Sequence, residues 1–414
     1  MSEKILIVEE SLRDLKAHWF EYIKTINTAA KANNWQVDVA SHRDVAPEIK
    51  KQLSIFPLFD RAYYLDNNKK KLPGWRYYGF ILHSLHCLKV LFPFLNRQPR
   101  YDEIFVPTVL LHHLIAWWAI ASFHPLAPKH ITLFFVTNPG VWHRDKQRAI
   151  LPKSARLQGW LLKLFSNSIK QGKVTLAVET RGAKREFERL AGVPFRLLPH
   201  PVPEFDLKST NDKALNFACY GFARYEKGSD LFKKAITRIL NRQPNFEAQF
   251  RLQWVEPFTL PNGVICHPDR EFCQHFQVSI IDRPLPSQDY QTLLQATKCM
   301  VLPYRNSSYH ARVSRVAIEA IFLGIPVIYT KGGWLEEVVT GFGAGIGIED
   351  ENVSDLVAAI ELMSVNYSCY RQQAIAKIPA ARRYFSSQNF FNLLVSRSHF
   401  IQQPATVTSY SSIS

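Results

Sequence analysis

Two cations follow a short apolar run near the middle of the sequence. In residues 220–228, YGFARYEKG, Arg224 and Lys227 stand three positions apart, and Gly228 opens a segment with helical periodicity. A helix N-terminus presents free backbone N–H groups and the positive end of the helix dipole, to which the two side chains would add full charges. Together these groups could bind a diphosphate. On its own the motif is a weak signal, because solvated Arg and Lys side chains are common.

A single acidic side chain interrupts an apolar helical segment further along the chain. Glu319 lies in residues 315–323, which lead into the buried-strand pattern of residues 326–329. An acid in this position either pairs with a nearby arginine in the core or points into a cleft. A carboxylate in a cleft can accept hydrogen bonds from both hydroxyl groups of a ribose. Gly332 and Gly333 follow the strand and expose bare backbone to a close ligand.

The order of apolar and amphipathic segments indicates which elements would position these residues. Strands are expected at residues 4–9, 36–40, 103–106, 131–136, 174–178 and 196–198, and again at 215–220, 249–255, 278–281, 299–302 and 326–329. Helices are expected at residues 19–32, 229–241, 287–296, 315–323 and 354–365. The proline-rich stretch 198–204 and the polar stretch 205–213 are typical of a linker. Two doubly wound α/β units joined in this way place a ligand cleft at the carboxyl ends of their strands.

The size and composition of the chain fit this two-domain organisation. With 414 residues the chain is too long for one ordinary core. We expect a first domain at residues 1–205, a second at 206–385, and a C-terminal helix with a disordered polar tail at 386–414. The six cysteines form no CxxC pair, and the first residues do not resemble a signal peptide. A cytoplasmic location without disulfides is therefore expected.

The positive charge is concentrated in the first half of the chain. Residues 1–205 contain 30 Lys and Arg against 17 Asp and Glu, a net charge of +13 out of the total of +16. This excess indicates an anionic partner such as a membrane surface or a phosphate-bearing acceptor. No nucleic-acid-binding motif accompanies the charge, so nucleic acid is not expected. Residues 67–100 mix cations with aromatic side chains and predict either an interfacial helix on anionic lipid or a helix packed on its own domain.

Two motifs taken together resemble those of the GT-B glycosyltransferases, and within them glycosyltransferase family 4. The motifs are YGFARYEKG and IEAIFLGIPVIYTKGGWLEEVV, and the resemblance covers residues 214–365. The first half is similar only in its general organisation. The resemblance implies an α/β protein with two Rossmann-like, doubly wound domains facing a cleft. It also implies that Arg224 and Lys227 bind the donor diphosphate and that Glu319 binds the donor ribose.

The sequence departs from the family at one acidic position. The family has an E-x7-E pair, and the first position of that pair is Ala311 here. Tyr309, Arg312 and Ser314 resemble the Y..R.S variant of some bacterial members, in which Arg312 would add a phosphate contact. The donor-binding residues expected from the resemblance and the motifs are Glu319, Arg312, Ser314, Gly332, Gly333 and Arg283.

In the first domain the candidates are two histidines. His143 lies in residues 134–145, after an expected strand, where the family often has a histidine near the reacting carbon; it could equally be a plain loop histidine. His18 lies after the first strand, where relatives contact the acceptor. His143, Arg224 and Lys227 are the expected catalytic residues, with the cations stabilising charge on the leaving phosphate. The resemblance implies no metal, and the sequence contains no Asp-x-Asp motif; no cofactor is expected.

The predicted function is that of a hexosyltransferase-type glycosyltransferase, metal-independent and retaining. It would move a sugar from a nucleotide-sugar donor to a glycan or lipid-linked acceptor, as a cytoplasmic protein on the inner face of the membrane. Two alternatives stay open from the sequence. One is a GT-B-fold epimerase of sugar nucleotides, which would need acid–base pairs in the cleft. The other is a catalytically silent scaffold, favoured by the alanine at position 311.

Overall fold

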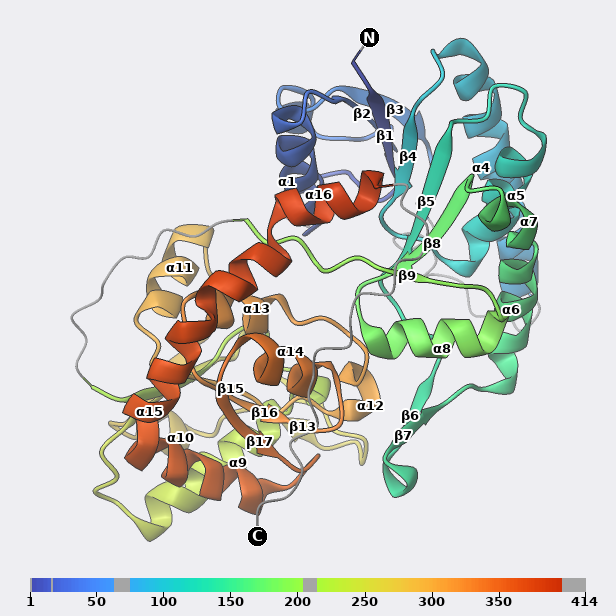
Figure 1. Cartoon of the computed structure of the whole chain (residues 1–414). Coiled ribbons are helices and arrows are strands. Elements are labelled where there is room, and N and C mark those ends of the chain that lie inside the picture. Colours follow the sequence, from blue (N-terminus) through green and yellow to red (C-terminus); the bar gives the residue numbers. More distant parts are fainter. Residues whose placement is uncertain (1, 16–17, 63–74, 204–213, 397–414) are drawn as a thin grey trace, which may run out of the picture.

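The computed structural model describes residues 2–15, 18–62, 75–203 and 214–396. Two α/β domains lie one above the other, each built around its own parallel sheet (Figure 1). The linker expected at residues 198–213 lies partly outside the described residues, and the polar tail expected at residues 402–414 lies wholly outside them. The predicted α/β architecture of two doubly wound, Rossmann-like domains is confirmed.

The first sheet has the strand order β3-β2-β1-β4-β5-β8-β9, and its neighbouring strands are parallel. Its strands are β1 (Lys4–Glu9), β2 (Gln36–His42), β3 (Ile55–Phe59), β4 (Glu103–Val106), β5 (His130–Phe135), β8 (Val174–Val178) and β9 (Arg196–Leu197). The central strands are buried on both faces, which explains why they consist of nearly continuous apolar residues.

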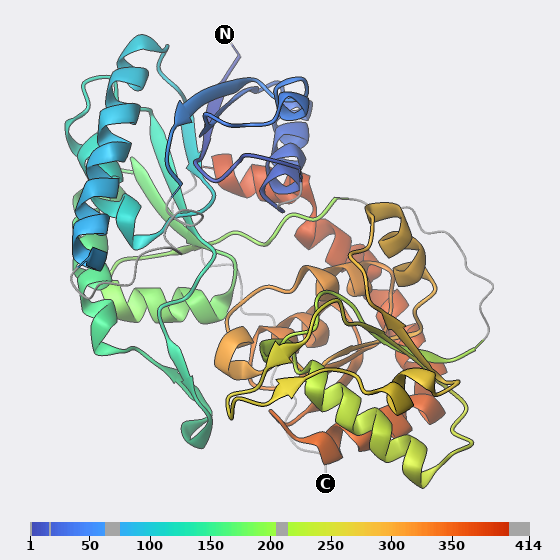
Figure 2. The same cartoon turned by 180° about the vertical axis from the view of Figure 1, so that it is seen from behind.

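Helices cover both faces of the first sheet. They are α1 (His18–Ala32), α2 (Pro47–Lys50), α4 (Trp75–Arg97), α5 (Leu114–Phe123), α6 (Arg156–Lys163), α7 (Ser166–Lys170) and α8 (Arg181–Ala191). The bounds of α8 follow from local chemistry: the Thr180 hydroxyl accepts a hydrogen bond from the Ala183 amide, and Gly192 ends the helix with a positive φ of 65°. A hairpin of β6 (Val141–His143) and β7 (Arg148–Ile150) projects from this domain along the second one (Figures 1 and 2).

The second sheet has the order β14-β11-β10-β15-β16-β17. Its strands are β10 (Asn216–Cys219), β11 (Gln249–Gln253), β14 (Val278–Ile281), β15 (Cys299–Leu302), β16 (Val327–Thr330) and β17 (Gly345–Ile348). Its helices are α9 (Ser229–Arg242), α10 (Arg270–Gln274), α11 (Ser287–Gln295), α12 (Asn306–Tyr309), α13 (Arg315–Phe322), α14 (Trp334–Phe342) and α15 (Val353–Phe385), and a small hairpin joins β12 (Phe258–Thr259) to β13 (Ile265–Cys266).

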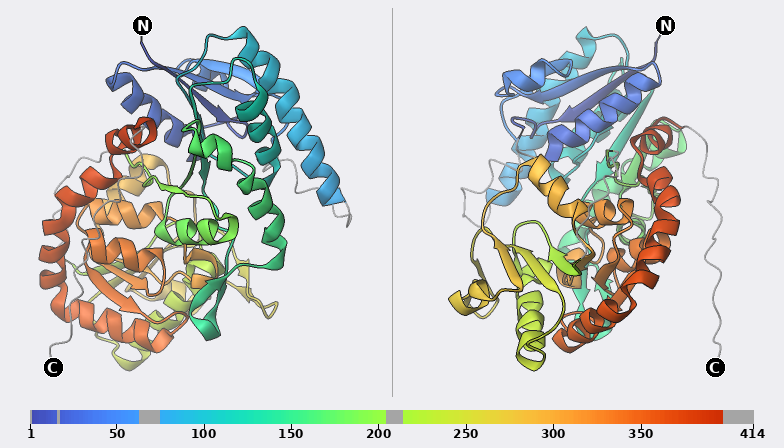
Figure 3. Two further views of the ribbon diagram at one scale, coloured as in Figure 1. Left: turned by 45° about the vertical axis from the view of Figure 1, so that its right-hand side comes forward. Right: turned by 90° about the vertical axis from the view of Figure 1, so that its left-hand side faces the viewer.

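The last helix of the described chain returns to the first domain. After α15 has run along the second domain, α16 (Ser387–Val395) lies beside α1 (Figures 1 and 3). Its Phe390, Phe391 and Leu394 are buried in the same apolar cluster as the residues of α1. The C-terminal segment therefore completes the core of the domain with which the chain begins.

Candidate functional site

The crevice of the second domain is set by the strand order. β10 pairs with β11 on one side and with β15 on the other, so the chain changes direction between β10 and β15. In doubly wound sheets, ligands bind beyond the carboxyl ends of the strands at such a switch point. The loops that follow β10 and β15, residues 220–228 and 303–314, flank this crevice. They contain most of the cations expected to bind the donor.

Lys227 is held close to the backbone of the β10 loop. Its Nζ lies so near to Gly221 that a Cβ added there would be 2.5 Å from it. Burial lowers the pKa of Lys227, and the Arg224 charge lowers it further against the opposing effects of Cys219 and Glu226. A partly desolvated ammonium in this position interacts strongly with an incoming anion. The next residue, Gly228, has a φ of 65° and no room for a Cβ beside the Pro303 carbonyl.

Arg224 lies in the same loop as Lys227 and Arg312 in the loop after β15, both at the carboxyl end of the second sheet. The Arg224 side chain is more than half exposed and pairs with Glu226, with 3.6 Å between Nη1 and Oε1. Arg312 is exposed. Burial and the Glu226 carboxylate raise the pKa of Tyr309, and Arg312 and Arg224 act against this, so both cations lie within electrostatic range of one hydroxyl. The structure thus brings these three cations to the crevice.

A buried arginine that sequence reasoning missed joins the two loops. Arg305 makes a bidentate pair with Asp230, both N–O distances being 2.9 Å, and its Nε lies 2.5 Å from an oxygen of Glu351. Its guanidinium also stacks on Tyr225, 3.7 Å from the ring centroid. Arg305 therefore fixes the loop after β15 against the loop after β10 and the first turn of α9.

Glu319 is buried and already has two donors. Its Oε1 accepts a hydrogen bond from Arg315 Nε at 2.7 Å, and its Oε2 accepts one from the Tyr290 hydroxyl at 2.5 Å. Among the described contacts, none joins Glu319 to Arg224 or Lys227. The geometry is that of the ion-pair alternative considered from the sequence, and a ribose would have to displace one of the two partners. Its role in donor binding stays a prediction.

The other predicted donor residues have structural contacts of their own. Ser314 caps α13 by accepting a hydrogen bond from the Ala317 amide. The two glycines lie against protein rather than open space, since added Cβ atoms at Gly332 and Gly333 would approach Asn306 to 3.1 and 2.8 Å. The Gly332 amide donates to Glu336. Gly332 is nevertheless exposed, and a contact of this glycine pair with a ligand stays a prediction.

Arg283 lies beyond β14, at the edge of the sheet. Its guanidinium is exposed and pairs with Asp289 at 3.4 Å. Its backbone is linked to the crevice, because Gln253 donates to the Arg283 carbonyl and accepts from the Gly221 amide. A donor contact by the Arg283 side chain stays a prediction.

Neither role predicted for a histidine of the first domain is tested by the described contacts. His143 lies on β6, 44% exposed, with Asp145 4.0 Å away. Its neighbour Trp142 faces the second domain and packs against the His310 ring at a tilt of 31°, with ring centroids 5.4 Å apart. Because successive side chains of a strand point to opposite faces, His143 points away from that contact. His18 begins α1, and its side chain lies outside the described residues, so both roles stay predictions.

The first domain meets the loop after β15 directly. His310 Nε2 lies 2.9 Å from Glu186 Oε1 and 3.0 Å from Asn138 Nδ2, and Thr180 donates to the Ala311 carbonyl at 2.8 Å. Ala311 is buried against α8. A Cβ added at Gly182 of that helix would lie 3.1 Å from the Cβ of Ala311. The position of the missing glutamate is therefore filled by the first domain.

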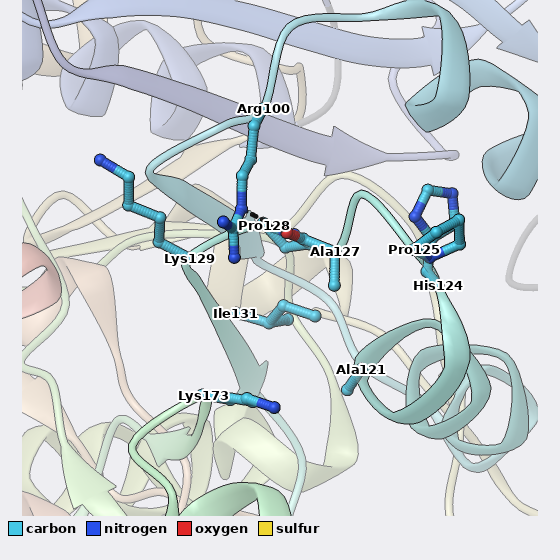
Figure 4. Close-up of a pocket in the computed structure, with 9 residues that line it drawn as sticks. All are labelled: Arg100, Ala121, His124, Pro125, Ala127, Pro128, Lys129, Ile131 and Lys173. Atoms are coloured by element: carbon cyan, nitrogen blue, oxygen red, sulfur yellow. Dashed lines mark hydrogen bonds between the residues drawn. The ribbon is translucent and has the colours of Figure 1, made fainter.

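One hollow of the described chain lies away from this crevice. It has a volume of about 190 Å³ and lies at the amino ends of the first-domain strands, opposite to the crevice (Figure 4). Arg100, Lys129 and Lys173 line it. The Arg100 guanidinium donates to the Ala127 carbonyl, and Lys129 pairs with Asp102. The carboxyl ends of the strands, where the fold places its ligands, are a better candidate for the reaction site.

Two facing Rossmann-like domains with a cationic crevice define the GT-B class. Residues 215–364 match the family model of the Glycosyl transferases group 1, so the resemblance is confirmed over this region. No curated protein is significantly similar to the chain in sequence.

Solved structures agree with this fold over the whole chain. Sucrose-phosphate synthase from Thermosynechococcus elongatus is 14% identical with a TM-score of 0.62, covering 94% of this chain and 96% of its own. Anabaena HepE, solved with UDP and glucose, is 15% identical with a TM-score of 0.61, covering 94% and 97%. A point mutant of S. aureus TarM, solved with fondaparinux, alpha-GlcNAc-glycerol and UDP, is 11% identical with a TM-score of 0.62, covering 95% and 100%.

Proposed function

We propose that the protein transfers a sugar from a nucleoside-diphosphate sugar to a glycan or lipid-linked acceptor, with retention and without a metal at the diphosphate. The observation that carries the proposal is the position of Lys227, Arg224 and Arg312 at the switch point of a group 1 glycosyl transferase domain. The family match supports glycosyl transfer as the class of reaction.

The proposed chemistry depends on charge stabilisation at the leaving group. When the bond between the sugar and the diphosphate breaks, negative charge grows on the phosphate oxygens, and fixed cations lower the energy of that state. Lys227 Nζ lies directly beside Gly221, in space that a side chain at that position would occupy. Arg224 and Arg312 are exposed and free to move onto the phosphates. These three charges would take the part that a divalent cation has in metal-dependent enzymes.

The first domain is proposed to hold the acceptor at an anionic membrane surface on the cytoplasmic side. By length and composition alone, the segment Gly79–Arg97 of α4 is the one helix of the described chain that could cross a membrane, and 28% of it is buried. Ile81, Leu82 and Leu85 are exposed, while His83 and Cys87 are buried. An apolar stripe on a helix of a basic domain suits a helix that lies in the lipid interface.

One observation favours the scaffold as a second candidate. The loop after β15 is packed against the first domain at Ala311 and His310, where a donor sugar would otherwise contact the family's first glutamate. A protein that binds a nucleotide or glycan without turning it over would tolerate this closure. The epimerase alternative lacks such support, since the acid–base pair of Glu186 and His310 is buried between the domains.

A donor screen tests the proposal. Thermal shifts measured with UDP-, GDP-, ADP- and dTDP-sugars should identify one nucleotide class that stabilises the protein. HepE and TarM were solved with UDP, which makes UDP-sugars the first to try. Labelled donor that binds should then be slowly hydrolysed or transferred in the presence of EDTA. Binding without turnover would favour the scaffold, and sugar interconversion the epimerase.

A further inference from the structure

A group of four ligand-type side chains lies buried in the first domain, outside the crevice described above. Glu10 follows β1, His83 and Cys87 lie one turn apart on α4, and His113 ends the short 3-10 helix η2 (Leu111–His113). One ligand atom of each residue lies within 4.8 Å of the ligand atoms of the others. The group lies at the switch point of the first sheet, because β1 pairs with β2 on one side and β4 on the other.

The spacing of the four side chains suits a single small cation. Glu10 Oε2 lies 2.9 Å from His83 Nε2 and 4.0 Å from Cys87 Sγ, and Glu10 Oε1 lies 3.3 Å from His113 Nε2. Around a tetrahedral zinc ion with bonds of about 2.0–2.3 Å, neighbouring ligand atoms stand roughly 3.3–3.6 Å apart. Of the three distances, 2.9 Å is shorter than this range, 3.3 Å lies at its lower end and 4.0 Å is longer. Small side-chain movements would therefore admit the ion.

Room for such an ion exists beside the group. A cavity of about 20 Å³ is lined by Glu10, Cys87 and His113, together with Glu9 and Thr108. A volume of this size holds one water molecule, and therefore also one metal ion. Apolar residues complete the lining, which is therefore mixed in character: Val8, Phe59, Leu91, Val106 and Trp117.

One ligand atom of the group has no hydrogen-bond partner. His113 is buried, and within the described part of the chain its Nε2 makes no hydrogen bond of ordinary geometry, although it points toward Glu10. At the other ring nitrogen, the Leu110 amide lies 3.1 Å from Nδ1, and the imidazole also forms a hydrogen bond with the backbone of Thr108. In the tautomer with the proton on Nδ1, Nε2 carries a lone pair toward the Glu10 carboxylate, 3.3 Å away. A cation between Nε2 and the carboxylate would bind both groups. In metal sites, a histidine ligand usually donates from its other ring nitrogen to a carboxylate or a backbone carbonyl.

We propose that Glu10, His83, Cys87 and His113 bind one zinc ion that fastens α4 to the end of β1. The charges balance, since a dication with one carboxylate, one thiolate and two neutral imidazoles is neutral, which suits a buried site. The thiol proton is released to solvent when the ion binds. The ion would hold together three elements of the first domain, and it is independent of the cations of the second domain that are proposed to bind diphosphate.

The competing arrangement is a hydrogen-bonded network without metal. In it, His113 keeps its proton on Nε2, accepts the Leu110 amide at Nδ1 and donates to Glu10. Cys87 then stays a thiol and donates a weak hydrogen bond to Glu10 Oε2. The two arrangements therefore differ in the state of the Cys87 sulfur, which can be observed directly.

Cobalt binding to the full-length protein tests the proposal. The purified chain, treated with chelator and then titrated with Co²⁺, should take up one ion per chain and develop the visible bands of tetrahedral Co²⁺ with an ultraviolet thiolate-to-cobalt band. Zn²⁺ should displace the Co²⁺ and abolish both signals. Protein purified from zinc-supplemented medium should contain zinc in a one-to-one ratio by mass spectrometry of the elements. Failure of the unmodified protein to bind either metal overturns the proposal, whatever the variants do.

Variants assign the ligands. Cys87→Ser should remove the thiolate band and His83→Gln should weaken zinc affinity by on the order of a hundredfold or more, because each loses a direct ligand. The matched controls are Cys369→Ser, an exposed cysteine on α15, and His86→Gln, on the same helix as His83 but outside the group. Both controls should bind metal as the unmodified chain does. A thiolate band that survives Cys87→Ser, or equal losses in variants and controls, would mean adventitious binding only.

Discussion

His310 of the second domain and Glu186 of the first domain lie 2.9 Å apart across the domain boundary. The pair has further contacts: Asn138 and the Gly140 amide also donate to Glu186, and Trp142 packs against the His310 ring in a tilted arrangement. Burial on its own would raise the pKa of Glu186, but the hydrogen bonds from His310 and Asn138 outweigh it and lower the pKa. The charged carboxylate therefore stabilises the closed arrangement of the domains.

The first prediction concerns the pH dependence of this contact. Glu186→Gln should lower the free energy of unfolding by about 1–3 kcal/mol at neutral pH, since a buried charge-assisted hydrogen bond is lost. Because the pKa of Glu186 is lowered by folding, its contribution is present above the ordinary glutamate range and disappears as pH falls through the lowered value. The difference between variant and unmodified protein should therefore shrink below about pH 4. Thermal unfolding of both proteins across pH measures this difference, with a Glu247→Gln variant at an exposed position as control. A stability difference that stays constant with pH would contradict a charged Glu186 at this contact.

The second prediction concerns Lys227. Lys227→Ala should lower turnover on the order of a hundredfold, because a fixed charge at the leaving phosphate is removed. Arg242→Ala is the matched control, as it removes one exposed cation from the far end of α9, roughly 20 Å away along the helix. Steady-state rates with the donor found in the screen, on variants with unchanged circular dichroism, provide the measurement. Equal rates for both variants would remove Lys227 from the reaction.

The third prediction separates two roles of Glu319. Glu319→Ala should weaken nucleotide affinity if the carboxylate leaves Tyr290 or Arg315 to bind a ribose. Tyr290→Phe removes only the hydrogen bond to Oε2 and should leave affinity equal or higher, because it frees an acceptor. Calorimetric titration of both variants with the nucleoside diphosphate distinguishes them. If neither variant changes affinity, Glu319 serves only to fix α13 against α11.

Much of the fold could be predicted from the sequence because buried parallel strands are apolar along their whole length. β1, β4, β8, β14 and β15 occupy the predicted residues. β3 was missed because Pro57 lacks a backbone N–H and breaks the strand pattern, and the structure places this strand at the edge of the sheet, where a proline is tolerated. The helix predicted at 354–365 continues to Phe385, but Asn366 has non-helical backbone angles at the predicted end.

The candidate site could be predicted only where its signal is local. Arg224 and Lys227 stand in one loop beside a helix start, so their spacing in the sequence is also their spacing in space. The pairs that fix the loops are of a different kind: Arg305 and Asp230 are 75 residues apart, and His310 and Glu186 are 124 apart. No periodicity links such residues. His143 on β6 was predicted from the family resemblance alone. The sequence gives no information on which face of this hairpin meets the second domain.

The fourth prediction uses two glycines with similar backbone angles. Gly228 has a φ of 65° and Gly263 one of 82°, so alanine is strained at both. An added Cβ would meet no atom within 4 Å at Gly263, whereas at Gly228 it would collide with the Pro303 carbonyl. Gly263→Ala should therefore cost about 1 kcal/mol of unfolding free energy, and Gly228→Ala at least about 1–3 kcal/mol more. Denaturant unfolding compares the two variants. Equal losses of unfolding free energy would show that the close approach of the β10 and β15 loops does not contribute to stability.

The last prediction concerns the exposed stripe of α4. Leu85→Glu should reduce binding to anionic vesicles about tenfold, because an apolar side chain worth roughly 1–2 kcal/mol in the interface is replaced by a charge that the lipid repels. Leu362→Glu on α15 is the matched control, since that leucine is similarly exposed on the second domain. Flotation with phosphatidylglycerol vesicles, repeated at increasing salt, should show binding that fades as the charges are screened. Equal flotation of both variants, or binding that does not depend on salt and lipid charge, would contradict the membrane proposal. The basic first domain would then be expected to bind a soluble anionic acceptor.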